Sequence, residues 1–242
     1  NYCAGLTMTS KKFNKLFGGP PRKPQNEITQ KEMDMARSVQ EVTEEVVYKM
    51  AKHVRKETGM KHLCLTGGVA LNCVSNGKLL RSNLFDDIFI QPAAGDAGGA
   101  LGSAYYTWYH VNGNSRVVKN NEDSMNGCYL GPKYSNDEIK TFLLDKNVPF
   151  EKRTDQELTE RIANKVANEK VVGWFQGRME FGARGLGGSS IIGDARSSIM
   201  QKILNLKIKY RASFRPFAPS ILADDINEWF ETNTKTPYML IV

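Results

Sequence analysis

A glycine-rich stretch set among arginines carries the strongest chemical signal in the sequence. Residues 177–219 place five glycines between positions 177 and 188 and continue into the basic segment KYRASFRPFAP. Glycines let backbone N–H groups approach a ligand closely, and guanidinium groups pair with oxyanions through two parallel hydrogen bonds. The stretch therefore predicts a site for phosphate or acyl-phosphate groups, with a basic solvated surface loop as the alternative. Its arginines are Arg178, Arg184, Arg196, Arg211 and Arg215.

Two further glycine turns each follow a short apolar segment. TGGVALN (66–72) comes after residues 62–65, and PAAGDAGG (92–99) comes after residues 88–91. Because a helical pattern follows each turn, the strand–turn–helix unit occurs twice, which indicates an α/β fold with ligands at the carboxyl ends of the strands. A phosphate or ribose could lie against the N–H groups that begin these helices. For the first turn, a plain tight turn is the alternative.

Asp96 is the single acid of the second turn. Its carboxylate could bind a metal or a sugar, or it could simply cap the following helix. A lone aspartate does not make a metal site, and His53, His62 and His110 are too far apart in sequence to pair with one another. We expect all three histidines to be structural or surface residues. The sequence contains neither a G-x-S-x-G elbow nor a GxxxxGK[ST] phosphate loop.

The elements that must position these residues can be predicted from capping and periodicity. A long helix should begin at Thr29, in a capping box, and end at Gly59. The polar segment 111–127 is the clearest linker. After it, we expect helices over 135–144 and 154–169 and strands over 148–152 and 170–175. The aromatic residues Trp174, Phe175, Tyr105, Tyr106 and Trp108 are expected in the core.

Composition sets broad limits on the class of protein. The 242 residues are 40% hydrophobic and carry a net charge of +7, which suits one or two globular domains with anionic ligands. The four cysteines form no C-x-x-C pair, and we expect reduced thiols and a cytoplasmic location. No apolar run is long enough to span a membrane. The sequence begins at Asn1 without a signal peptide and ends in what reads as an interrupted strand over 238–242, so we expect an excised piece of a longer chain.

The motifs TGGVALN, QPAAGDAGGALG, GWFQGRMEFGARGLG and KYRASFRPFAPS, in this order, resemble the O-carbamoyltransferase family of nodulation proteins and antibiotic-biosynthesis enzymes. The resemblance runs from GLTMTSKKF near the start to the final PYMLIV. It implies that residues 1–126 are the second half of an actin-like (ASKHA) domain similar to tRNA threonylcarbamoyltransferases. Residues 127–242 would be a C-terminally truncated YrdC-like domain, so that both parts are α/β.

The resemblance also implies a reaction. The YrdC-like part would join carbamoyl phosphate and ATP, with Mg²⁺, into carbamoyl-adenylate. The actin-like part would then pass the carbamoyl group to a substrate hydroxyl with the help of an iron-type divalent metal. The histidine ligands of that metal would lie outside this chain, so we expect the chain alone to be unable to complete the transfer.

Residue by residue, the resemblance implies three groups. Arg178, Arg184, Arg211 and Arg215 would bind carbamoyl phosphate and nucleotide phosphates, and Asp96 would complete the metal site. Gly67, Gly68 and Asn72 match the nucleotide-contacting turn, to which we add the neighbouring Val69, Gly95 and Gly98 as nucleotide-binding candidates. The sequence departs from the family at Ser189, where an arginine is common in the motif GPRALGNRSI.

Two alternatives remain open at this point. A nucleotide- or RNA-binding module without transfer activity would also be basic, and it would lose affinity steeply with salt. A purely structural α/β domain would leave the glycine–arginine loop unexplained. For the enzyme, we expect small-molecule substrates as partners, neither nucleic acid nor a membrane, and a possible homodimer.

Overall fold

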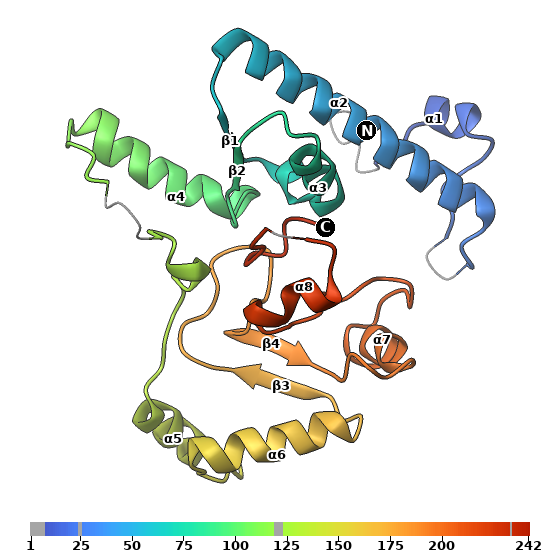
Figure 1. Cartoon of the computed structure of the whole chain (residues 1–242). Helices are drawn as coiled ribbons and strands as arrows, with labels where there is room; N and C mark the ends of the chain where they lie inside the picture. The colour runs from blue at the N-terminus through green and yellow to red at the C-terminus, as the bar shows by residue number, and fades with distance from the viewer. Residues whose placement is uncertain (1–7, 24–25, 119–122, 233) are drawn as a thin grey trace. The chain divides into compact units, whose positions relative to one another are not determined.

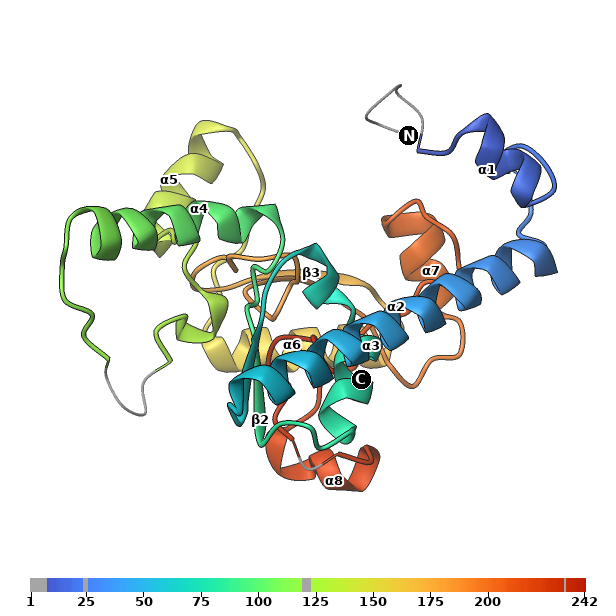
Figure 2. The ribbon, with the colours of Figure 1, turned by 90° about the horizontal axis from the view of Figure 1, so that it is seen from above.

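The computed structural model describes residues 8–23, 26–118, 123–232 and 234–242. Its compact units are residues 1–50 and residues 51–242, and the helix α2 (Gln30–Thr58) runs across the boundary between them. Both views show α2 as one unbroken helix (Figures 1 and 2). The first unit also contains α1 (Lys11–Leu16), which the side chain of Ser10 caps. Within the described ranges, no helix is long and apolar enough to cross a membrane.

The helix α2 begins and ends as its sequence predicts. At its start, the N–H and hydroxyl of Thr29 both donate to the carboxylate of Glu32. At its end, Gly59 adopts a φ of 66° and its N–H returns to the carbonyl of Arg55, as expected for a glycine that terminates a helix. The apolar side of α2 is largely exposed, however, from Val39 to Val54, although Ala51 is buried.

The first α/β element of the second unit is a parallel pair. Strand β1 (His62–Leu65) pairs with β2 (Asp87–Ile90) in the register His62–Asp87 to Leu65–Ile90. A 3₁₀ turn, η1 (Gly68–Leu71), and α3 (Cys73–Arg81) connect the strands, and α4 (Asp96–Tyr106) follows β2 (Figure 1). The core here is built from the side chains of Leu79, Phe85, Ile88, Ile90, Ala93 and Ala94.

The second half of this unit contains an antiparallel pair of strands and several helices. Helices α5 (Asn136–Asp145) and α6 (Asp155–Ala167) each begin with a complete capping box, formed by Ser135 with Glu138 and by Thr154 with Glu157. Strand β3 (Val172–Phe175) pairs with β4 (Ser189–Ile192), and α6 contacts β3 (Figure 1). Short helices follow β4 along the chain: α7 (Met200–Ile203), η4 (Leu204–Ile208), η5 (Ala223–Asp225) and α8 (Ile226–Trp229).

Some expectations from the sequence are wrong. Residues 148–152 form no strand but an irregular connection between α5 and α6, and residues 238–242 form no strand either. Instead, that last segment lies along α3, where the buried amide of Asn76 donates to the carbonyl of Leu240 and the N–H of Val242 donates to Cys73. Of the aromatic residues expected in the core, Trp174 is half-buried, and the side chains of Tyr105, Tyr106, Trp108 and Phe175 are exposed.

The expected linker has two kinds of structure. Residues 112–118 lack regular secondary structure, as predicted, and residues 119–122 fall outside the described ranges. The last part of the linker is held by the side chain of Asp123. Its carboxylate accepts hydrogen bonds from the N–H groups of Met125 and Gly127 and from the Tyr238 hydroxyl. A π turn, η2 (Thr107–Val111), precedes the linker, and a 3₁₀ turn, η3 (Asn126–Cys128), ends it.

Candidate functional site

The two glycine turns lie against each other at the carboxyl ends of the parallel strands. The N–H of Gly67 donates to the carbonyl of Ala94 at 2.8 Å, which joins the turn after β1 to the turn after β2. Gly67 has a φ of 91°, a conformation that suits glycine and strains other residues. Asn72 caps α3 by accepting the N–H of Ser75 at 3.1 Å. The predicted nucleotide-binding residues of both turns are therefore neighbours.

Each of these glycines plays a different part. A side-chain carbon placed on Gly67 or Gly68 would meet no atom within 4 Å, so the first turn faces open space. On Gly98, by contrast, that carbon would come within 2.1 Å of the carbonyl oxygen of Ala93. Gly98 is thus needed for close packing of α4 on its own turn. Gly95 is the N-cap residue of α4, without a side chain to cap the helix.

Asp96 is the first residue of α4, and its side chain is exposed. In this position a carboxylate interacts favourably with the helix dipole. Among the residues that the structure describes, no group of three His, Cys, Asp or Glu side chains could hold a metal ion. His53, His62 and His110 are exposed, as expected. The described residues of this chain therefore do not by themselves make up the expected metal site.

The glycine–arginine loop is organised by Glu180, which the sequence patterns did not single out. Its carboxylate accepts hydrogen bonds from the N–H groups of Leu186 (2.6 Å), Gly188 (2.8 Å) and Ser189 (3.1 Å) and from the Ser189 hydroxyl (2.6 Å). Burial alone would raise the pKa of Glu180, but the Ser189 hydroxyl and the backbone N–H groups outweigh it and lower the pKa to about 2. The backbone donors of this loop are thus already used by the chain's own carboxylate.

This finding changes how the loop could bind an anion. The sequence predicted that the glycines would bring backbone N–H groups to a phosphate, but three of those groups hold Glu180 instead. Ser189, the position at which the resemblance implies an arginine, is part of the same arrangement. Binding of an oxyanion would then depend on the arginine side chains themselves.

Two of the four candidate arginines are hydrogen-bonded to the buried side-chain amide of Asn205, one through its guanidinium and one through its main-chain carbonyl. Asn205 is fully buried, and its Nδ2 donates to the carbonyls of Ser213 (3.0 Å) and Arg215 (2.8 Å) while its Oδ1 accepts Nε of Arg211 (2.6 Å). The Arg211 guanidinium also lies over the ring of Phe217, 4.9 Å from its centre. Arg211 is half-buried and Arg215 is exposed. Asn205 was missed because a single asparagine in a helical run carries no recognisable signal in the sequence.

The other two arginines have different neighbours. Arg178 is exposed and donates to the carbonyl of Gly131 at 2.9 Å. Arg184 is half-buried and donates through Nη2 to the carbonyl of Leu71 at 3.3 Å, in the first glycine turn. Through Asn205, the hydrogen bonds of the structure therefore connect Arg211 with the main chain of Arg215. Arg184 is connected instead to the first glycine turn, and Arg178 to the segment before α5.

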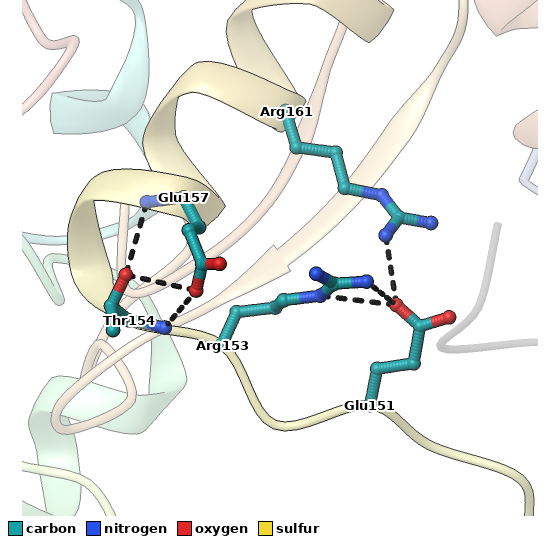
Figure 3. A network of polar contacts seen from close by, with 5 residues as sticks. All are labelled: Glu151, Arg153, Thr154, Glu157 and Arg161. Atoms are coloured by element: carbon teal, nitrogen blue, oxygen red, sulfur yellow. Dashed lines mark hydrogen bonds and ion pairs between the residues drawn. The ribbon is translucent and has the colours of Figure 1, made fainter.

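A second polar surface lies along α6. A depression of about 580 Å³ is lined by charged and amide side chains between Arg153 and Lys170. Figure 3 shows that Glu151 accepts hydrogen bonds from both Arg153 and Arg161, next to the capping box of Thr154 and Glu157. Hydrogen bonds and the charge of Arg153 lower the pKa of Glu151. Since both of its arginines already have Glu151 as a carboxylate partner, we do not regard this depression as the anion site.

Comparison with known proteins identifies two family models in the chain. Residues 1–105 match the model described as carbamoyltransferase N-terminus, and residues 163–242 match the model described as carbamoyltransferase C-terminus. An uncharacterized protein of Synechocystis is 54% identical over 100% of this chain and 40% of its own length. The nodulation protein NolO of Bradyrhizobium diazoefficiens is 41% identical over 89% of the chain and 39% of its own length.

A third relative has an enzyme name. The 3'-hydroxymethylcephem-O-carbamoyltransferase of Streptomyces clavuligerus is 29% identical over 74% of this chain and 31% of its own length. The chain thus spans between 31% and 40% of the length of these three relatives. The matches cover both halves of the second unit, including the glycine turns and the arginine loop.

Proposed function

The chain belongs to the carbamoyltransferase family, and we propose that it is part of an ATP-dependent enzyme that carbamoylates a hydroxyl group. The observation that carries this proposal is the arrangement around Asn205, which holds the guanidinium of Arg211 and the main-chain carbonyl of Arg215 on one segment. Arginines on such a segment are suited to an acyl phosphate, because their charge offsets the repulsion between the anions that must meet. We further propose the family's division of labour between two parts.

In that division, residues 1–126 belong to an actin-like domain and residues 127–242 to a YrdC-like domain. The second part would form carbamoyl-adenylate from carbamoyl phosphate and ATP with Mg²⁺. For the atoms to balance, one water is consumed, and pyrophosphate and inorganic phosphate leave. In the transfer, the acceptor oxygen bonds to the carbamoyl carbon, the bond to AMP breaks, and the hydroxyl proton is released.

The residues of this chain would serve binding and charge stabilisation. Arg211 and Arg215 would hold the carbamoyl phosphate, and Arg178, from the glycine–arginine loop before β4, would add a further cation. Fixed cations of this kind stabilise charge that develops at phosphorus. The turns at Gly67 and Gly95 would contact the nucleotide. Asp96 would supply one ligand of an iron-type metal whose histidines lie outside the chain, a proposal that rests on the resemblance alone. A cytoplasmic location and a homodimer likewise stay predictions.

Calorimetric titration of the chain with carbamoyl phosphate tests the proposal. We expect saturable binding that weakens by about tenfold or more in Arg211→Gln, since one charge-assisted pair is lost. Arg161→Gln is the matched control, because it removes the same charge from the ion-paired surface of α6. Equal loss in both variants, or no binding by the folded chain, would contradict a carbamoyl phosphate site at Arg211.

Two further measurements separate the alternatives. If the chain is an RNA-binding module, its affinity for RNA should fall steeply with salt, whereas binding of carbamoyl phosphate should depend mainly on individual arginines. We also expect the 242-residue chain alone to release no carbamoylated product, because the metal site is incomplete within its described residues. Detection of that product by mass spectrometry would disprove this expectation.

A further inference from the structure

The glycine–arginine loop contains a group of donors that a side chain of the same loop fills. The N–H groups of Leu186, Gly188 and Ser189 and the Ser189 hydroxyl converge on the carboxylate of Glu180, at distances from 2.6 to 3.1 Å. We refer to these four donors as the loop nest. Converging backbone N–H groups of this kind form concave binding sites for anions, so the carboxylate takes the place that a bound oxyanion has elsewhere.

The loop nest is also held from outside, by bonds that do not involve Glu180. The carbonyl of Leu186 accepts a hydrogen bond from the Tyr129 hydroxyl, and the carbonyl of Gly188 accepts the N–H of Gln176 at 2.8 Å. Ser189 is the first residue of β4, which pairs with β3. The donors would therefore keep their directions if the carboxylate left.

The space in the loop nest depends on the missing side chain of Gly188. A carbon attached there would come within 3.2 Å of the carboxyl carbon of Glu180 and within 2.6 Å of the carbonyl oxygen of Arg178. Any larger residue at this position would thus enter the volume that the anion occupies. The glycine keeps that volume open for one oxyanion.

Hydrogen-bond donors alone hold the Glu180 carboxylate. Among the residues that the structure describes, no arginine or lysine forms an ion pair with it. The nearest arginines of the loop donate elsewhere, Arg178 to the carbonyl of Gly131 and Arg184 to the carbonyl of Leu71. Donors that hold a carboxylate oxygen bind a phosphate oxygen by the same kind of charge-assisted bond. An external oxyanion could therefore replace Glu180 without breaking an ion pair.

We propose that the loop nest is a binding site for a small oxyanion and that Glu180 is its internal competitor, bound when no ligand is present and displaced when a phosphate enters. The inference rests on the proposed function in that carbamoyl phosphate would supply the phosphate in the enzyme. While Glu180 fills the nest, a phosphate depends on the arginine side chains. Because only the fraction of chains with an open nest can bind in it, Glu180 lowers the apparent affinity and so regulates the site.

The test empties the loop nest by Glu180→Ala and uses inorganic phosphate and acetate as probes. In calorimetric titrations, we expect phosphate to bind the variant at least about tenfold more tightly than the wild type, because no internal anion competes. Acetate replaces the lost carboxylate, so it should raise the melting temperature of Glu180→Ala and leave that of the wild type unchanged. Glu180→Gln keeps the size of the side chain without its charge, and we expect a gain in phosphate affinity of at least about threefold.

Glu157→Ala is the matched control. Its carboxylate also accepts a backbone N–H and a hydroxyl, both from Thr154, but at an exposed helix start. We expect this variant to show no gain in phosphate affinity and no stabilisation by acetate. A gain equal to that of Glu180→Ala would trace the effect to the loss of any negative charge and would overturn the proposal.

The other outcomes are equally decisive. Equal phosphate affinity in the wild type and in the folded Glu180 variants would show that Glu180 only orders the loop. Stabilisation of Glu180→Ala by acetate without any gain in phosphate binding would restrict the nest to carboxylates and would also overturn the competition. If Glu180→Ala does not fold, the phosphate affinity of Glu180→Gln decides by the same criterion. Binding of carbamoyl phosphate by Arg211→Gln tests the proposed function separately, so the two proposals can fail independently.

Discussion

The buried amide of Asn205 fixes the guanidinium of Arg211, whose Nε donates to Asn205 Oδ1 at 2.6 Å. The same side chain holds the carbonyls of Ser213 and Arg215. In Asn205→Ala, three polar groups would lose their partner at a fully buried position. We expect the free energy of unfolding to fall by about 2–4 kcal/mol, measured by urea denaturation.

Gln201→Ala is the matched control for this change. The amide of Gln201 also reaches the carbonyl of Arg215, at 3.1 Å, but from an exposed position where water can replace it. Its loss should therefore cost no more than about 0.5–1 kcal/mol. Similar losses of unfolding free energy for the two substitutions would mean that the burial of Asn205 does not determine its contribution to stability.

Glu180→Gln should remove a pH-dependent part of the stability. The pKa of Glu180 is lowered to about 2 from 4.5, so its contribution is fully present above about pH 4.5 and is lost as the pH falls toward 2. After allowance for solvent screening, we expect the wild type to be more stable than the variant by about 2 kcal/mol at pH 7. The difference should shrink between pH 4.5 and 2 in denaturant titrations.

Asp194 titrates over the same range, because hydrogen bonds from Arg196 lower the pKa of Asp194 to about 2. That contribution is present in both proteins and cancels in the difference. Should the gap between wild type and Glu180→Gln stay constant from pH 7 to 2, the carboxylate of Glu180 would not be the group that orders the loop.

Two adjacent glycines of α4 offer a direct comparison. In Gly98→Ala the new methyl group would collide with the carbonyl of Ala93, and we expect a loss of stability of about 1–3 kcal/mol. In Gly99→Ala the methyl group meets nothing within 4 Å, so the higher helix propensity of alanine should add about 0.5–1 kcal/mol. Thermal denaturation of both variants checks the signs, and equal shifts would argue against the close contact at Gly98.

The thiols should differ in reactivity. Cys64 is exposed, whereas Cys128 is buried and donates to the carbonyl of Phe181. Burial, together with the charges of Asp123 and Glu180, raises the pKa of Cys128 and keeps it in the unreactive thiol form. We expect a thiol reagent to label Cys64 at least about a hundred times faster, as followed by peptide mass spectrometry. Rapid labelling of Cys128 in the folded chain would show that its surroundings open readily.

Local signals made several parts of this fold predictable from sequence. The capping box at Thr154, the glycine stop at Gly59 and the strands that precede both glycine turns depend on residues within a few positions of one another. The strand expected over 148–152 failed for a related reason. Among the residues that the structure describes, no strand pairs with residues 148–152, and pairing rather than propensity decides whether a strand forms.

The organisation of the site was less predictable, because it depends on contacts between distant residues. Nothing in the sequence distinguishes Glu180 from the other acidic residues. Its role depends on the fold of the loop, which brings three backbone N–H groups within hydrogen-bonding distance of its carboxylate. The link from Arg184 to Leu71 spans 113 positions. Periodicity and spacing carry no information about such pairs, and the resemblance supplied the residue types without their partners.

The parallel pair of β1 and β2 has a consequence for solvent access to the backbone. Within the described ranges, each of these strands has a single strand partner, and successive amides of a strand point to opposite sides. Only every second amide can therefore be shielded by a bond to the other strand. Amide hydrogens along His62–Leu65 should exchange with deuterium in an alternating pattern, so that slow and fast positions follow each other residue by residue through the strand that leads to Gly67.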